Sequence, residues 1–188
     1  MQENHPALHA GRVVVAHLGN GASLCAVREG LSVDTTMGLT ALDGLPMGTR
    51  PGSIDPGAVL FMLRHLGMSV DEVEAELYHR SGLKGLSGIS NDVETLLKSN
   101  DPRAAFALDY FALRTAQQIA AMAASLTGID ALVFTGGVGE NAAPVRQAIL
   151  SRLGFLGDFP TLVIPANEER MMGMLALRLL DGSRNNAT

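Results

Sequence analysis

Arg50 lies in a stretch whose composition is typical of a binding loop. The stretch runs from Met37 to Gly57 and reads MGLTALDGLPMGTRPGSIDPG. Glycine permits positive φ and close backbone approach, proline fixes φ, and rigid folds often carry binding groups on such loops. Arg50 is the only strong cation of the stretch, and a planar guanidinium suits paired hydrogen bonds to a carboxylate or phosphate. The alternative is a surface loop with an exposed arginine.

A second polar cluster, HLGNGAS at residues 17–23, separates the apolar runs 13–16 and 24–27. Asn-Gly between two apolar runs indicates a tight hairpin, and a type I′ turn would account for Asn20 and Gly21 without any ligand. The turn does not account for His17, Gly19 and Ser23, which add side-chain donors and a glycine backbone that a ligand can approach closely. A loop that cradles phosphate needs both of these features.

A third cluster, FTGGVGEN at residues 134–141, follows the strand candidate 131–134 and precedes a helical pattern. A strand, a glycine turn and a helix N-terminus together present backbone N–H groups to a nucleotide. The alternative is an ordinary βα turn whose glycines permit close packing. The spacing does not match the dinucleotide fingerprint, and the sequence contains no Walker A motif. Any nucleotide is therefore expected to bind the loops of another fold.

Short apolar runs, turn residues and helix-capping residues predict the elements that position these clusters. The chain opens with three short strands, at residues 12–17, 22–28 and 31–36. The Arg50 loop follows the third strand. Asp55-Pro56 then predicts a capped helix start with proline at its first position, and Ser69 with Glu72 predicts a capping box for a second helix.

The second half of the sequence predicts alternating helices and strands. Residues 83–88 break the periodicity, and their glycines predict a loop. A long helix is expected over residues 101–127, ended by Gly128. Two βα units follow, with strands at 131–134 and 161–164 and helices at 140–153 and 167–180. Residues 182–188 lack apolar anchors, which predicts a disordered tail.

Composition favours one globular domain. The chain has 188 residues, of which 47% are hydrophobic, enough for a sizeable core. No apolar run reaches the roughly 18 residues that cross a bilayer, and no signal-like N-terminus is seen. A net charge of −5 without a basic run argues against nucleic acid or membrane partners. The single cysteine, Cys25, is interpreted as a small core residue of a cytoplasmic protein.

Together these segments resemble the acetate kinase family, within the sugar kinase, actin and Hsp70 superfamily. The resemblance rests on HLGNGAS, the Arg50 stretch, FTGGVGENA and IPANEE, in this order. It implies an α/β, ribonuclease H-like nucleotide-binding domain over residues 12–181, with a mixed sheet flanked by helices after a polar lead at residues 1–11. Acetate kinases consist of two related halves, and this chain resembles only the C-terminal half.

The resemblance also implies roles for individual residues. By its place in MGTR, Arg50 resembles the catalytic arginine that stabilises the phosphoryl group in flight. Glu168 resembles the acidic ligand of Mg²⁺, whereas without the motif Glu168 and Glu169 would be interpreted as helix N-terminal acids. The residues that resemble ATP or ADP contacts are His17, Leu18, Gly19, Asn20, Gly21, Asp92, Val93, Glu94, Gly137, Val138, Gly139, Glu140 and Asn141.

One position departs from the family pattern. The family usually has an arginine two positions after the aspartate that matches Asp92, and this chain has Glu94 there. A carboxylate near a polyphosphate costs on the order of 1 kcal/mol of favourable interaction at a partly solvated position. Weaker nucleotide binding is therefore expected.

The implied activity is phosphoryl transfer between ATP and acetate or propionate, by a cytoplasmic homodimer that uses Mg²⁺. In the family, the catalytic aspartate and the arginine that binds the acyl carboxylate lie in the N-terminal half. The chain alone is therefore expected to be inactive and to need that half as a partner. The alternative is a non-catalytic nucleotide-binding or dimerisation module.

Overall fold

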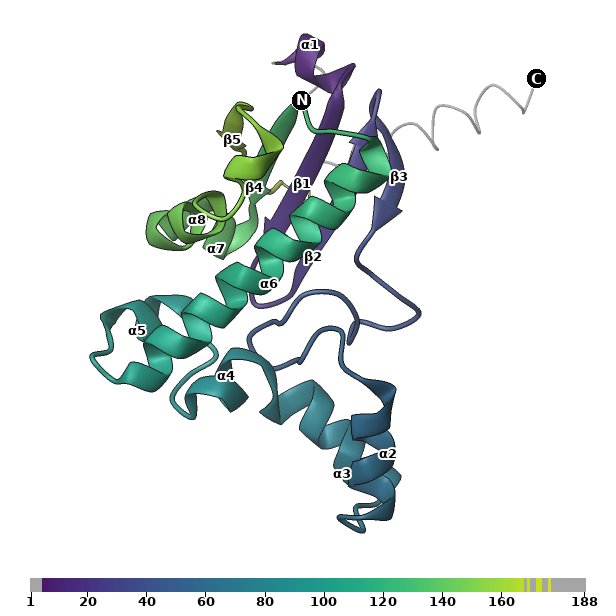
Figure 1. Cartoon of the computed structure of the whole chain (residues 1–188), viewed down its shortest axis with the longest axis vertical. Helices are drawn as coiled ribbons and strands as arrows, with labels where there is room; N and C mark the ends of the chain where they lie inside the picture. Colours follow the sequence, from purple (N-terminus) through teal and green to yellow (C-terminus); the bar gives the residue numbers. More distant parts are fainter. Residues whose placement is uncertain (1–4, 168, 170–171, 174–175, 177–188) are drawn as a thin grey trace, which may run out of the picture.

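The computed structural model describes residues 5–167, 169, 172–173 and 176. Within them the chain forms a five-stranded mixed sheet in the order β3-β2-β1-β4-β5 (Figure 1). The strands are β1 (Arg12–Leu18), β2 (Ala22–Arg28), β3 (Leu31–Thr35), β4 (Ala131–Thr135) and β5 (Thr161–Val163). The first three form an antiparallel meander, and β4 and β5 run parallel to β1. This arrangement confirms the predicted α/β fold with a mixed sheet.

Helices account for most of the remaining elements. They are α1 (Pro6–His9), α2 (Pro56–Arg64), α3 (Val70–Ala75), α4 (Gly82–Ser87), α5 (Val93–Lys98), α6 (Pro102–Leu126), α7 (Gly136–Asn141) and α8 (Ala143–Leu150). A π-helical turn, η1 (Glu76–Arg80), continues α3, and a 3-10 turn, η2 (Gly154–Leu156), follows α8. No helix in the described part of the chain is long and apolar enough to cross a membrane.

The long helix α6 crosses one face of the sheet diagonally (Figure 1) and packs against β1, β2 and β3. Asp101 caps its first turn by accepting a hydrogen bond from the Arg103 amide at 2.8 Å, and Pro102 occupies the first helical position. Its alanine-rich inner face lets the helix approach the sheet closely. At its centre Phe111 is 1% exposed and joins the core that holds Leu24 and Phe134 of the sheet.

The turns of the meander differ from the expected hairpin. The type I′ geometry occurs between β2 and β3, where Glu29 and Gly30 both have positive φ, of 52° and 78°. Between β1 and β2 the strand pairing ends at Leu18 and Ala22, so residues 19–21 form a three-residue connection. Asn20 does not have positive φ. A type I′ turn therefore does not explain the Asn-Gly pair.

Two sequence predictions about helices are wrong. Residues 83–88 form α4 and its cap rather than a loop, because Leu83 and Ser87 share a buried face and Gly88 ends the helix with φ of 64°. The single helix predicted over 140–153 is two helices, because Ala142 has a non-helical ψ of 74°.

Further differences concern single elements. The glycine cluster after β4 is itself helical, as α7, and the sequence did not predict α1 or α5. Cys25 is half-buried rather than a core residue, because its side chain alternates with the buried side chains of Leu24 and Ala26 along β2. The helix predicted at 167–180 falls largely outside the described residues, and the tail predicted at 182–188 lies entirely outside them.

Candidate functional site

A cavity of about 620 Å³ opens beyond the carboxyl ends of β1 and β4. Three segments that are far apart in the sequence line it: the β1–β2 connection, α5 and α7. The lining residues are Gly19, Asn20, Asp92, Val93, Glu94, Leu97, Gly137, Val138, Asn141 and Ala142. Ligands of open α/β sheets bind beyond the carboxyl ends of the strands, and we call this space the upper cavity.

The charged groups that line the upper cavity are two carboxylates, Asp92 and Glu94, which accept hydrogen bonds. Asp92 caps α5, where its Oδ2 accepts hydrogen bonds from the Thr95 amide at 2.9 Å and from the Thr95 hydroxyl at 2.7 Å. The hydroxyl bond is the main cause that lowers the pKa of Asp92, so this carboxylate is ionised at neutral pH. Glu94 Oε1 pairs with Lys98 Nζ at 2.5 Å on the exposed side of α5.

The lining residues of the upper cavity include no Lys or Arg. Its surface combines two carboxylates with the apolar side chains of Leu97 and Val138. Such a surface suits a neutral, flat group that carries hydrogen-bond donors, and it does not suit an anion.

A second hollow, of about 250 Å³, adjoins the upper cavity and shares Gly19 and Asn20 with it. It is lined by His17, Gly19, Asn20, Gly21, Ala22, Ser23, Met37, Met47 and Arg50. We call it the lower hollow. Arg50 is the only Lys or Arg among these residues, so the lower hollow carries the positive charge that the upper cavity lacks.

Arg50 is held in place from two sides. Its Nη1 donates to the carbonyl oxygen of Ala41 at 2.8 Å, within the same loop. Its Nη2 lies where a side chain at position 21 would be, since a Cβ built on Gly21 would be 2.8 Å from it. Glycine at position 21 is therefore needed for the guanidinium to lie against the β1–β2 connection.

Helix α4 supports the backbone of the Arg50 loop. The Leu83 amide donates to the carbonyl oxygen of Met47 at 2.9 Å, and the Met47 amide donates to the carbonyl oxygen of Arg50 at 2.9 Å. Gly82 has φ of 61°, and a Cβ there would lie 2.1 Å from the Met47 carbonyl oxygen. The helix that replaces the predicted loop at 83–88 thus fixes the position of Arg50.

Asn20 joins the loops that surround both spaces. Its carbonyl oxygen accepts a hydrogen bond from the Gly48 amide at 3.1 Å, and its side-chain Oδ1 accepts one from Asn91 Nδ2 at 3.1 Å. A Cβ on Gly48 would lie 2.2 Å from Asn20 Oδ1. Glycine at position 48 is therefore needed for the Arg50 loop to lie this close to Asn20. These contacts give Asn20 a structural role beside its place in the lining.

The structure brings most of the sequence-predicted site residues together. Eight of them line the upper cavity: Gly19, Asn20, Asp92, Val93, Glu94, Gly137, Val138 and Asn141. His17 and Gly21 lie with Arg50 in the lower hollow. The lining residues that were not among the predicted contacts are Leu97 and Ala142 of the upper cavity and Ala22, Ser23, Met37 and Met47 of the lower hollow. Leu97 lies one helical turn after Val93 on α5 and would have followed from that helix.

The remaining predicted site residues lie elsewhere. The Leu18 side chain is 0% exposed in the core, and Gly139 is buried against Phe134 at the base of α7. Glu140 accepts hydrogen bonds from two backbone amides and does not line either space. Glu168 lies outside the described residues.

The described part of the chain contains no group of three or more His, Cys, Asp or Glu side chains that could hold a metal ion. A magnesium ion that keeps several waters and binds phosphate oxygens needs only one or two protein carboxylates.

Comparison with known proteins gives consistent matches over nearly the whole chain. A family model described as the acetokinase family matches residues 4–172. The acetate kinase of Nitrobacter hamburgensis is 47% identical over 195 residues, which cover 93% of this chain and 48% of that protein.

Solved structures show the same relationship. Acetate kinase of Porphyromonas gingivalis superposes with a TM-score of 0.86 at 31% identity, over 92% of this chain and 50% of that one. A propionate kinase of Francisella tularensis gives 0.84 at 40% identity, over 89% and 50%. The chain spans about half the length of the curated relatives that it matches.

Proposed function

This chain belongs to the acetokinase family, and we propose that it is the C-terminal, nucleotide-binding half of an acetate kinase-type phosphotransferase. The observation that carries the proposal is the pair of adjoining spaces that share Gly19 and Asn20. The upper cavity offers carboxylates and apolar surface, and the lower hollow offers the cation Arg50. A nucleoside polyphosphate has the same division, with a donor-bearing nucleoside at one end and anionic phosphates at the other.

The proposed nucleotide therefore lies with its nucleoside in the upper cavity and its phosphates toward the lower hollow. Asp92 and Asn141 face the nucleoside end, where ribose hydroxyls and base amino groups can donate hydrogen bonds. The backbone of residues 19–21 lies at the junction, where glycine permits close approach by phosphates. ATP and ADP have the required length and charge distribution.

Arg50 is the proposed catalytic residue of this half. In phosphoryl transfer, negative charge spreads over the oxygens of the transferring group, and a fixed cation stabilises that charge without reorganising. The hydrogen bond from Nη1 to Ala41 leaves the opposite edge of the guanidinium beside Gly21, in the lower hollow. Magnesium would enter with the nucleotide and neutralise phosphate charge, with Glu168 as its proposed protein ligand.

Transfer to acetate or propionate needs groups that bind and orient the carboxylate acceptor. The two spaces supply one arginine, which the phosphoryl group would occupy, and the matched relatives are about twice as long as this chain. We therefore propose that turnover requires an N-terminal half, in the cytoplasm, and that the chain alone binds nucleotide without turnover. A non-catalytic nucleotide-binding or dimerisation module is the second candidate, and the presence of a single arginine among the residues that line the two spaces supports it.

We also propose that the chain forms a homodimer. Large apolar side chains are exposed on and after α2, including Leu60 at 49%, Phe61 at 52% and Leu66 at 59%. Apolar side chains that lie together on a surface favour association. Light scattering at micromolar concentration should report about twice the 19.7 kDa chain mass, and a clean monomer would contradict the proposed pairing.

Calorimetric titration with ADP and with ATP tests the nucleotide assignment. The wild-type chain is expected to bind both weakly, and Arg50→Ala is expected to weaken ATP binding about tenfold, because Arg50 is assigned to the transferring phosphoryl group and a charge-assisted hydrogen bond contributes roughly 1.5 kcal/mol or more. Arg64→Ala, on the exposed end of α2, is the matched control. An absence of heat at millimolar ADP would refute nucleotide binding, and equal losses in both variants would refute the role of Arg50.

A further inference from the structure

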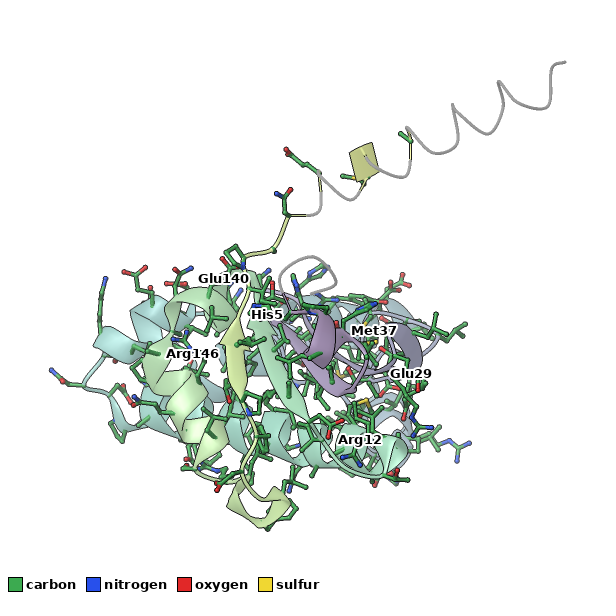
Figure 2. The ribbon with its side chains drawn as sticks, turned by 90° about the horizontal axis from the view of Figure 1, so that it is seen from above. His5, Arg12, Glu29, Met37, Glu140 and Arg146 are labelled. Atoms are coloured by element: carbon green, nitrogen blue, oxygen red, sulfur yellow. The ribbon has the colours of Figure 1, made fainter. Side chains whose placement is uncertain are left out.

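Glu140 connects two segments that are separated by many residues in the sequence. Its Oε1 accepts a hydrogen bond from the Gly136 amide at 3.0 Å and a second from the Ala166 amide at 2.9 Å. Figure 2 shows Glu140 close to the point where the chain leaves β5. One carboxylate oxygen of Glu140 thus joins the first residue of α7 to the segment that follows β5.

The turn after β4 is closely packed against the lower hollow. Gly136 has φ of 79°, and a Cβ there would lie 2.7 Å from the Leu18 carbonyl oxygen and 3.2 Å from the His17 ring. His17 itself lines the lower hollow. Because Ala166 donates to the same oxygen as Gly136, the segment after β5 is tied to the residue that packs against His17.

Glu140 has no charged partner among the described residues. It is half-buried, it forms no ion pair in the described part of the chain, and its only hydrogen-bond donors there are backbone amides. Hydrogen bonds from neutral amides to a carboxylate are stronger than bonds to a neutral acceptor. The carboxylate is therefore engaged by the protein and does not face either space.

We infer that Glu140 is a positioning residue that fixes the segment after β5 beside the phosphate end of the nucleotide, without contacting the nucleotide itself. The inference rests on the function proposed above. It replaces the direct nucleotide contact that the sequence resemblance implied for Glu140. Glu168, the proposed magnesium ligand, follows Ala166 by two positions in the sequence.

Two substitutions separate positioning from direct contact. Glu140→Gln keeps a side-chain oxygen that can accept from both amides, and it removes a negative charge near the phosphates. Glu140→Ala removes the acceptor. A positioning role predicts that glutamine preserves phosphate binding and alanine does not, whereas nucleoside binding in the upper cavity is unchanged in both.

The experiment is a titration of ¹⁵N-labelled full chain with adenosine and with ADP, followed by amide spectra, in the presence of Mg²⁺. We expect ADP affinity in Glu140→Ala to fall at least fivefold while adenosine affinity changes less than twofold. Glu140→Gln should bind ADP at least as tightly as wild type. The Gly136 and Ala166 amide signals should move upfield in the alanine variant, and the rest of each spectrum reports that the variant is folded. Glu74→Ala, on the exposed face of α3, controls for loss of one negative charge.

Three results would overturn the inference. An equal loss of adenosine and ADP affinity in Glu140→Ala would indicate direct contact with the nucleoside. Unchanged ADP affinity in that variant would show that the hydrogen bonds from Gly136 and Ala166 to Glu140 do not contribute to phosphate binding. The proposed function would remain intact. If the wild-type chain binds neither ligand, the proposed function fails and this inference fails with it.

Discussion

Replacing Glu94 by arginine is expected to tighten ADP binding to the chain. Glu94 lines the upper cavity, but its side chain is 74% exposed and pairs with Lys98. Two unit charges 4 Å apart interact by about 1 kcal/mol in water and about 4 kcal/mol in a medium of dielectric constant about 20. High exposure and the Lys98 partner both place Glu94 at the low end of this range.

The charge changes by two units in Glu94→Arg, and the substitution also releases Lys98 from its partner. We expect a gain of about 1 kcal/mol, which corresponds to a Kd for ADP that is roughly fivefold lower. Glu94→Gln, which changes the charge by one unit, should give about half of that free energy. Salt should reduce the effect, because screening weakens interactions between exposed charges.

Calorimetry with ADP at low and at high salt measures this gain. Glu74→Arg on α3 has the same change in charge and is exposed away from the residues that line either space, so it reports the effect of net charge alone. Equal gains in the two arginine variants would mean that net charge, and not the position of Glu94, sets the affinity. An unchanged or higher Kd in Glu94→Arg would show that the charge at position 94, in the upper cavity, does not act on phosphates that lie toward the lower hollow.

Three further predictions concern the framework of the site. Phe111→Ala should lower the free energy of unfolding by about 3–5 kcal/mol in urea titration, because Phe111 is 1% exposed, and Phe106→Ala, at 58% exposure on the same helix, should change it little. The hydrogen bond from the Arg12 side chain lowers the pKa of Asp130 to about 2, so this carboxylate stabilises the fold above pH of about 4 and the contribution is lost as the pH falls toward 2. Thermal melts across this range should show a shallower acid limb in Asp130→Asn, and an identical slope would contradict the assignment. Gly82→Ala should destabilise the chain and weaken ADP binding together, since a Cβ there would lie 2.1 Å from the Met47 carbonyl oxygen; an unchanged melt would show that the loop adapts.

The elements that the sequence predicted well are those whose signals are local. The three strands of the meander are short apolar-rich runs separated by turn residues, and α6 begins at Asp101-Pro102 and ends before Gly128. The capping box of Ser69 and Glu72 is present as expected. Each of these features depends on residues within a few positions of one another.

The elements that the sequence did not predict depend on distant partners. Helix α4 contains Gly82 and Gly85, which disfavour a helix locally, and it forms because Met47 and Gly48 accept its first amides. Asn20 looked like a turn residue, but its contacts run to Gly48 and Asn91. No spacing rule relates these positions.

The candidate site shows the same difference between features with local sequence signals and features that depend on distant partners. Motif resemblance located most of the residues that line the two spaces, since the motifs are contiguous. It did not indicate that Glu140 faces the backbone of Gly136 and Ala166, because this contact arises from the packing of β5 beside β4. Which member of a motif faces the ligand depends on tertiary structure.

Acetyl phosphate formation, followed by the hydroxamate assay, tests the central claim most directly. The purified chain, supplied with ATP, Mg²⁺ and acetate, is expected to show no measurable activity. Addition of an N-terminal half from a matched acetate kinase should restore activity, and Arg50→Ala should abolish what is restored. Robust activity of the chain alone would contradict the claim that this half binds nucleotide but lacks the groups that bind and activate the acceptor.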